Sequence, residues 1–161
     1  MSATANPDTD VAVISLERVF QHISGRCALN DLTLQVCAGD ALLMLGPNGA
    51  GKSLTLRLML GLDQPSAGRV RVFGQDLARL DDRRLSQLRG RLGAMLQGGS
   101  LLDELSVLEN LLLPLRASPQ DPSGMARAAR LAVTQLQLDG MENLYPRALS
   151  LGQRRRTELA R

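Results

Sequence analysis

The sequence predicts an α/β fold built around one phosphate-binding loop. Residues 46–53 match the pattern G-x-x-x-x-G-K-[ST] at every required position. The apolar run at residues 41–45 is typical of a buried parallel strand, and residues 54–60 continue at helical spacing. Because strand, glycine-rich loop and helix follow one another in the required order, the sequence indicates a site for a nucleoside triphosphate.

The loop contains the residue types that phosphate binding requires. Its glycines let the backbone curl so that successive N–H groups converge on one phosphate, and the following helix adds its positive N-terminal end. Lys52 supplies a mobile charge to the terminal phosphates, and the hydroxyl of Ser53 is placed to ligate the Mg²⁺ that accompanies the nucleotide. Lys52 is also the only lysine of the chain. The alternative is a chance glycine-rich turn before a lysine, which this composition makes rare.

The composition indicates a soluble globular protein of one domain, or part of one. The 161 residues are 44% hydrophobic and carry a net charge of +3, yet only three of them are Phe or Tyr and none is Trp. Stacking platforms for bases are therefore nearly absent, and nucleic acid is not an expected partner. No stretch reaches the ~18 apolar residues of a membrane span. Residues 1–10 lack the features of a secretory signal and are expected to be a disordered tail.

Strands are predicted on both sides of the loop. Residues 11–14 and 32–36 have strand-forming composition, and residues 69–73 alternate between basic and apolar side chains. Another apolar run, at residues 92–96, is predicted as a strand that leads into Gln97. A glutamine at the carboxyl end of a strand, beside the end where the phosphate loop opens, can reach the metal or the attacking water.

Local signals predict the remaining helices. Residues 81–89 have helical spacing. Ser106 and Glu109 form a capping box before a short helix that Pro114 ends or kinks, and a longer helix is predicted from Pro122 to about residue 136.

A second capping box, formed by Ser150 and Gln153, begins the last helix. A serine-capped helix start with Gly152 beside it is a natural second anion site. The same stretch is also typical of a well-capped helix that binds nothing.

With the phosphate loop, Gln97 and residues 149–153 in this order, the chain resembles the ATP-binding subunits of ABC transporters. That family has a GPNGAGKST loop, a Q-loop glutamine roughly forty residues on, and an LSGGQ signature that opens a helix. The resemblance covers about residues 11–161. It implies an incomplete ABC ATPase domain with the P-loop NTPase fold: N-terminal antiparallel strands and a helical subdomain at about residues 100–155, truncated before the Walker B strand.

The resemblance implies that ATP and Mg²⁺ bind along the loop. Lys52 and Gln97 would be the catalytic residues, and Ser53 and Gln97 would hold the metal. The residues implied to line the nucleotide are Gly46, Pro47, Asn48, Gly49, Ala50, Gly51, Lys52, Ser53 and Leu54.

The resemblance also implies a head-to-tail homodimer with composite sites. Ser150, Gly152 and Gln153 would then contact the nucleotide that is bound to a second copy. The subunit would couple ATP binding and hydrolysis to transport across the inner membrane. It would lie in the cytoplasm, docked on a transmembrane permease, and reach the membrane only through that permease.

Within the family, residues 95–103, 107–110 and 114–116 most resemble the Mla-type ATPases that traffic phospholipid. Other lipid or small-solute ABC ATPases share much of this pattern. Phospholipid is therefore the expected cargo, with another lipid or a small solute as the alternative.

Several positions depart from the family pattern. Leu151 replaces the first glycine of the signature, where a branched side chain would hinder the close approach of a second subunit. Ile23 falls where an aromatic residue usually stacks on adenine, and Leu54 replaces a threonine. The chain ends at Arg161, before the family's Asp-Glu strand and switch histidine, so the alternative expectation is a truncated nucleotide-binding remnant that does not hydrolyse ATP.

Overall fold

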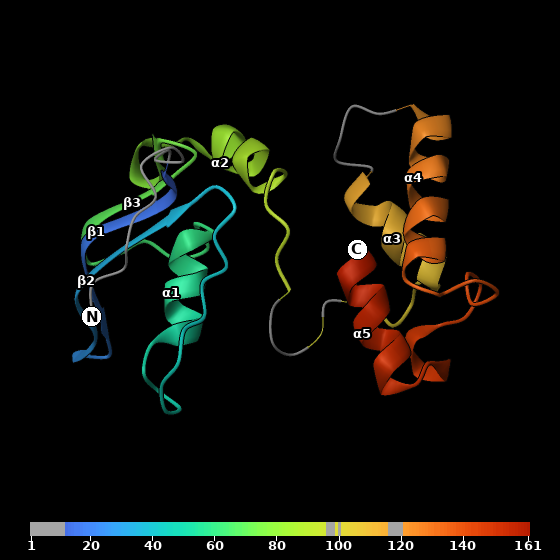
Figure 1. Cartoon of the computed structure of the whole chain (residues 1–161), viewed down its shortest axis with the longest axis horizontal. Helices are drawn as coiled ribbons and strands as arrows, with labels where there is room; N and C mark the ends of the chain where they lie inside the picture. The colour runs from blue at the N-terminus through green and yellow to red at the C-terminus, as the bar shows by residue number, and fades with distance from the viewer. Residues whose placement is uncertain (1–11, 96–98, 100, 116–120) are drawn as a thin grey trace. The chain divides into compact units, whose positions relative to one another are not determined.

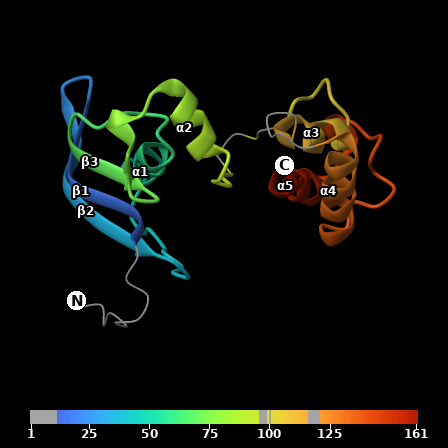
Figure 2. The ribbon, with the colours of Figure 1, turned by 90° about the horizontal axis from the view of Figure 1, so that it is seen from above.

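The computed structural model describes residues 12–95, 99, 101–115 and 121–161. The chain divides into two compact units, residues 1–92 (unit 1) and residues 93–161 (unit 2), and each unit is described by itself. Figures 1 and 2 show that the sheet belongs to unit 1, whereas unit 2 is helical. The tail expected at residues 1–10 lies outside the described residues.

Unit 1 contains a four-stranded antiparallel sheet. Its spatial order is β2-β1-β3-β4, and its strands are β1 Ala12–Ile23, β2 Arg26–Cys37, β3 Ala67–Val72 and β4 Gln75–Asp76. β1 pairs with both β2 and β3, which makes β1 an inner strand. The predicted strands at residues 32–36 and 69–73 fall largely within β2 and β3. β1 extends well beyond the predicted residues 11–14, up to the turn at Ser24 and Gly25.

Helices cover one face of this sheet. Figure 2 shows α1 (Lys52–Met59) against the sheet, followed along the chain by η1 (Leu77–Arg79) and α2 (Asp82–Arg89). The alternation in β3 explains this packing, because Val70 and Val72 are buried while Arg69 and Arg71, which alternate with them, are more exposed. The buried core of unit 1 consists of Leu16, Val19, Leu29, Leu58, Met59, Val70, Val72, Leu77 and Leu88.

The predicted parallel strands at residues 41–45 and 92–96 are wrong. Neither residues 41–45 nor residues 92–95 form a strand, and Leu96 lies outside the described residues. An extended segment becomes a strand only when a neighbour completes its hydrogen-bond ladder, and no described strand runs beside residues 41–45. The side chains of Leu43 and Leu45 are consequently 76% and 83% exposed.

The helices that capping signals predicted are present in unit 2. Its helices are α3 Val107–Leu115, α4 Pro122–Gln135, η2 Pro146–Ala148 and α5 Leu151–Ala160. Their apolar faces meet in a second core that consists of Val107, Leu111, Ala129, Val133, Leu138 and Leu149. None of the described helices has the length and the unbroken apolar sequence that would span a bilayer.

A fully buried amide organises the start of unit 2. The Asn110 Oδ1 atom accepts a hydrogen bond from the Leu102 N–H at 2.9 Å. Its Nδ2 group donates to the carbonyl oxygens of Leu102, Leu105 and Ser106, each at 3.0 Å. Because a buried polar group is costly unless it is hydrogen-bonded, these contacts fix the loop before α3 against the helix.

Candidate functional site

The loop before α1 has the curled backbone that its glycines predict. Gly49 and Gly51 have φ angles of +85° and +86°, in the left-handed region that side chains disfavour. The Ala50 N–H donates to the Pro47 carbonyl at 3.2 Å and closes the turn between them. Residues 46–50 are exposed, so the loop faces solvent with its backbone accessible to a ligand.

Gly51 joins this loop to the sheet. A Cβ atom at this position would lie 2.5 Å from Leu29 Cδ2 and 3.1 Å from the Ala28 carbonyl oxygen, both on β2. The Gly51 carbonyl accepts two hydrogen bonds from buried Thr55, one from its N–H at 2.8 Å and one from its Oγ1 at 3.0 Å. Gly51 is therefore held by its close packing against β2 and by its hydrogen bonds with Thr55, and these contacts fix the first turn of α1.

The Lys52 side chain folds back onto the start of the loop. Its Nζ atom donates to the carbonyl oxygens of Gly46 and Pro47, each at 2.7 Å. The ammonium group is thus held above the loop with one donor left for a ligand, since an ammonium has three. The positive charge therefore lies beside the first two carbonyl groups of the loop.

The start of α1 differs from the other helix starts. Gly51 is its N-cap and provides no side-chain acceptor, and its first turn contains no acidic residue. Among the α-helices that the structure describes, α2, α3, α4 and α5 all begin with a side-chain cap. The first N–H groups of α1 and its positive dipole end are therefore available to an anion.

The two residues after Lys52 differ in their exposure to solvent. Ser53 is exposed at the start of α1, whereas Leu54 is partly buried and packs against the unit 1 core. The Ser53 hydroxyl fits a Mg²⁺ ion that arrives with a nucleotide, because Mg²⁺ keeps several waters and takes few protein ligands. No group of three or more His, Cys, Asp or Glu side chains within the described ranges could hold a metal by itself. Gln97, the other predicted metal and catalytic residue, lies outside the described residues.

The second predicted anion site is a complete capping box. The Gln153 N–H donates to Ser150 Oγ at 3.3 Å, and the Ser150 N–H donates to Gln153 Oε1 at 2.7 Å. Gly152 is exposed, and a Cβ atom there would meet nothing within 4 Å. Leu151, next to it, is 74% exposed. These residues form a cluster of their own in unit 2, with the Gln153 side chain already engaged.

An arginine that local sequence signals do not reveal closes the other end of α1. The Arg89 Nε atom donates to the Leu60 carbonyl at 3.1 Å, and its Nη2 atom donates to the Gly61 carbonyl. Arg57 and Asp63 add a two-point ion pair at 2.6 and 2.8 Å. The hydrogen bond from Arg57 holds the pKa of Asp63 below its usual value. Arg89 acts from another helix, so no capping pattern in the sequence could identify it.

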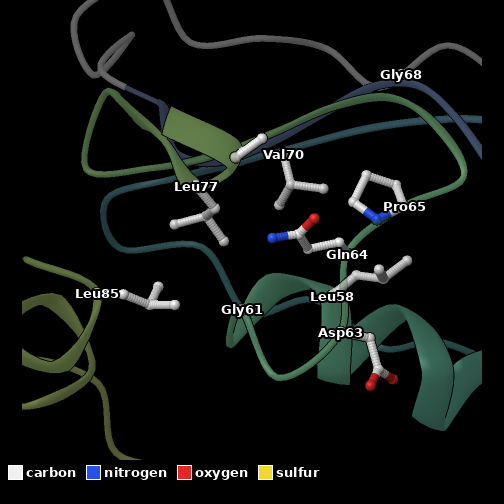
Figure 3. Close-up of a pocket in the computed structure, with 10 residues that line it drawn as sticks. Leu58, Gly61, Asp63, Gln64, Pro65, Gly68, Val70, Leu77 and Leu85 are labelled. Atoms are coloured by element: carbon white, nitrogen blue, oxygen red, sulfur yellow. The ribbon is translucent and has the colours of Figure 1, made fainter. Parts of the chain in front are cut away.

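An apolar hollow also lies near the C-terminal end of α1, away from the phosphate loop. Leu58, Val70, Leu77 and Leu85 line it, as Figure 3 shows. The carboxylate of Asp63 points away from its centre, toward its ion pair with Arg57. Gln64 also lines this hollow, with its amide directed inward, but no Lys or Arg does. The candidate phosphate site is therefore the loop at the opposite end of the helix.

Comparison with protein families gives a match over most of the chain. The family model described as "ABC transporter" matches residues 29–161. This range includes the loop, α1 and the capped start of α5.

Curated relatives resemble nearly the whole chain. The methionine import ATP-binding protein MetN 2 of Enterococcus faecalis is 37% identical over 155 residues, which cover 94% of this chain and 45% of the relative. MetN 2 of Paraburkholderia xenovorans is 37% identical over 157 residues, with 95% and 41% covered. The sulfate/thiosulfate import ATP-binding protein CysA of Synechocystis sp. is 32% identical over 148 residues, with 92% and 40% covered. The chain thus spans less than half the length of these relatives.

Solved structures share the fold. A dimeric post-hydrolysis state of the ATP-binding cassette MJ0796, bound to ADP and Pi, superposes with a TM-score of 0.81 at 28% identity. The match covers 91% of this chain and 67% of that chain. Another dimeric structure of MJ0796, described as a bacterial ABC transporter cassette, gives a TM-score of 0.82 at 28% identity, with the same coverage.

Proposed function

This chain belongs to the ABC transporter family and has the P-loop fold of its ATPases, as predicted; from that premise we propose that it is the ATP-binding part of an ABC transporter subunit. In the complete protein it couples ATP binding and hydrolysis to transport. One observation above all supports this role: α1 begins without a side-chain cap, directly behind an exposed loop over which Lys52 holds its charge.

The residues at this loop have distinct proposed roles. The backbone N–H groups of residues 46–53 bind the β- and γ-phosphates, with the dipole of α1 behind them. Lys52 neutralises the terminal phosphates, and Ser53 holds Mg²⁺, an ion that offsets the negative charge of phosphate oxygens. Gln97 contacts the metal and the attacking water. Leu54 contributes through its backbone, because its side chain packs against the core.

A second copy of the chain is the proposed partner at the composite site. Ser150, Gly152 and Gln153 at the start of α5 face the nucleotide of that copy in a head-to-tail homodimer. The dimer docks on a transmembrane permease from the cytoplasmic side, at the inner membrane, and the chain contacts the bilayer only through the permease. The likeness to dimeric cassettes supports the pairing.

The cargo we propose is a small solute that enters the cell. The relatives reported above are named as methionine and sulfate/thiosulfate import proteins. The Mla-type phospholipid assignment, which residues 95–103, 107–110 and 114–116 favoured, finds no support among these relatives. Stimulation of the full-length protein and its permease in vesicles by methionine or sulfate would support import. Stimulation by phospholipid alone would restore the lipid assignment.

Titration of the folded chain with Mg-ATP tests nucleotide binding. Lys52→Ala should weaken binding by about a hundredfold or more, because a charge-assisted contact to phosphate is lost. Arg83→Ala is the matched control, since it removes an exposed cation from α2 and should leave affinity unchanged. A folded chain that ignores Mg-ATP would contradict the proposal. ATP binding with no measurable turnover would favour the truncated, non-hydrolysing remnant instead.

A further inference from the structure

A second hollow of unit 1, the α2 hollow, lies between α2 and the turn that joins β3 to β4. It is open to solvent and has a volume of about 360 Å³. Its lining residues are Gln75 on β4, Arg84, Gln87 and Leu88 on α2, and Arg91 just after that helix. None of residues 46–53 lines it, so the α2 hollow is separate from the phosphate loop.

The lining of the α2 hollow donates hydrogen bonds and carries positive charge. A guanidinium group has five N–H donors and no acceptor, and each glutamine adds two N–H donors. Leu88 is 3% exposed and gives the hollow an apolar floor. Within the ranges that the structure describes, no carboxylate forms an ion pair with Arg84 or Arg91. Two positive charges at this hollow are therefore uncompensated.

The Arg91 side chain is already oriented. Its Cζ atom lies 4.0 Å from the centre of the Phe73 ring. Phe73 and Gly74 form the two-residue turn between β3 and β4, and both have positive φ angles, +50° and +74°. A positive φ is rare for a bulky residue, and this backbone places the ring under the guanidinium. Stacking fixes the plane of the guanidinium and leaves its N–H edge for a ligand.

We propose that the α2 hollow binds a phosphate monoester. This group carries a charge of about −2 at neutral pH, which matches the two unpaired arginines, whereas a single carboxylate would neutralise one of them. The fork of Arg91 or of Arg84 can donate two parallel hydrogen bonds to phosphate oxygens. The carboxamides of Gln75 and Gln87 donate to the remaining oxygens, and Leu88 contacts the organic part of the ester.

Glycerol 2-phosphate, added to the folded chain without Mg²⁺ or nucleotide, tests this site. NMR should show shifts of the backbone amides of residues 84–91 and of the Nε–H groups of the two arginines. Arg84→Gln and Arg91→Gln should each raise the Kd by about tenfold, because a charge-assisted contact is lost. Arg91→Lys should weaken binding nearly as much, since a lysine keeps the charge but has no fork. Arg83→Gln is the matched control: it removes an exposed charge from the adjacent position of α2, outside the hollow, and should leave the Kd unchanged.

A soluble ester and a lipid headgroup can both present this phosphate group. Phosphatidylcholine vesicles with and without phosphatidic acid distinguish them: cosedimentation that needs Arg84 and Arg91, without shifts from glycerol 2-phosphate, would assign the group to a lipid. An equal loss in Arg83→Gln, unchanged affinity in Arg91→Lys, or no binding of either probe would overturn the proposal. None of these results affects the proposed function, because Mg-ATP binding is measured at the phosphate loop.

Discussion

The starts of α1 and α5 differ in how their backbone N–H groups are paired. Both helices begin with N–H groups that have no partner in the preceding turn. At α5, the Ser150 and Gln153 side chains each accept a hydrogen bond from the other residue's backbone N–H, so two of these groups are already paired. At α1, Gly51 provides no acceptor, and the adjacent Lys52 side chain bonds to the loop and not to the helix.

This difference separates a structural helix start from one that is available to a ligand. A cap such as Ser150 contributes about 1 kcal/mol to stability, and α1 forgoes that contribution. Its first turn is held instead by Thr55 and by the contact of Gly51 with β2. The stabilising acceptor missing at α1 is the one that a phosphate would provide, and α5 needs no such ligand to be stable.

Replacing the two left-handed glycines of the loop should give the largest effect. Gly51→Ala combines a disfavoured φ with a clash against β2, and we expect a loss of about 3 kcal/mol in the free energy of unfolding. Gly49→Ala is the matched control, because its φ is similar but its Cβ would meet nothing within 4 Å. It should cost only about 1 kcal/mol. Urea unfolding measures both, and equal losses would show that the contact with β2 does not anchor the loop.

Serine replacements at the two helix starts should have opposite consequences. Ser150→Ala should lower the free energy of unfolding by about 1 kcal/mol, because α5 loses its cap. Ser53→Ala should leave stability unchanged without nucleotide and weaken the Mg²⁺-dependent part of ATP binding, since Ser53 is exposed and caps nothing. Thermal unfolding with and without Mg-ATP distinguishes the two. If Ser53→Ala lowered the stability and Ser150→Ala did not, the cap would be at the start of α1 and not at the start of α5, which would contradict this comparison.

Leu151 tests whether the start of α5 meets a second copy. Leu151→Gly should cost the isolated chain about 0.5 kcal/mol through helix propensity, yet it should raise the ATPase activity of the full-length protein by removing a branched side chain from the dimer interface. Leu159→Gly, also exposed on α5, is the control and should not raise activity. Unchanged activity in Leu151→Gly would exclude this residue as an obstacle to dimer closure.

The smallest effect concerns pH at the far end of α1. The pKa of Asp63 is lowered by its hydrogen bond from Arg57, so this carboxylate stabilises the fold above its unfolded pKa. That contribution is lost as the pH falls through the folded pKa. Asp63→Asn should therefore reduce stability slightly near neutral pH and make no difference in strong acid. Thermal unfolding between pH 7 and pH 2 measures this, and a difference that grows toward low pH would contradict the assignment.

Local chemistry explains which parts of the fold could be predicted from sequence. Each capping box, at Ser106 and at Ser150, lies within four consecutive residues, so its helix start was predictable. The run at residues 41–45 has the composition of a buried strand, but a strand also needs a neighbour, which local sequence does not provide. Its exposure in the structure is the result.

The candidate site shows the same division. The motif at residues 46–53 predicted the glycine loop and placed Lys52 and Ser53 at the start of a helix. It did not predict that Lys52 would bond to the Gly46 and Pro47 carbonyls, or that Arg89 would close the far end of α1. Those contacts depend on how the chain folds around α1, so the local sequence pattern does not predict them.

The most direct test is to follow backbone amide resonances of the chain by NMR while Mg-ATP is added, at a concentration where the chain is monomeric. Large shifts are expected for residues 49–53 and unchanged resonances for residues 151–153, because α1 begins without a side-chain cap behind the exposed loop and Lys52, whereas α5 begins with a capping box. Shifts confined to residues 151–153, or none in a folded chain, would contradict this expectation.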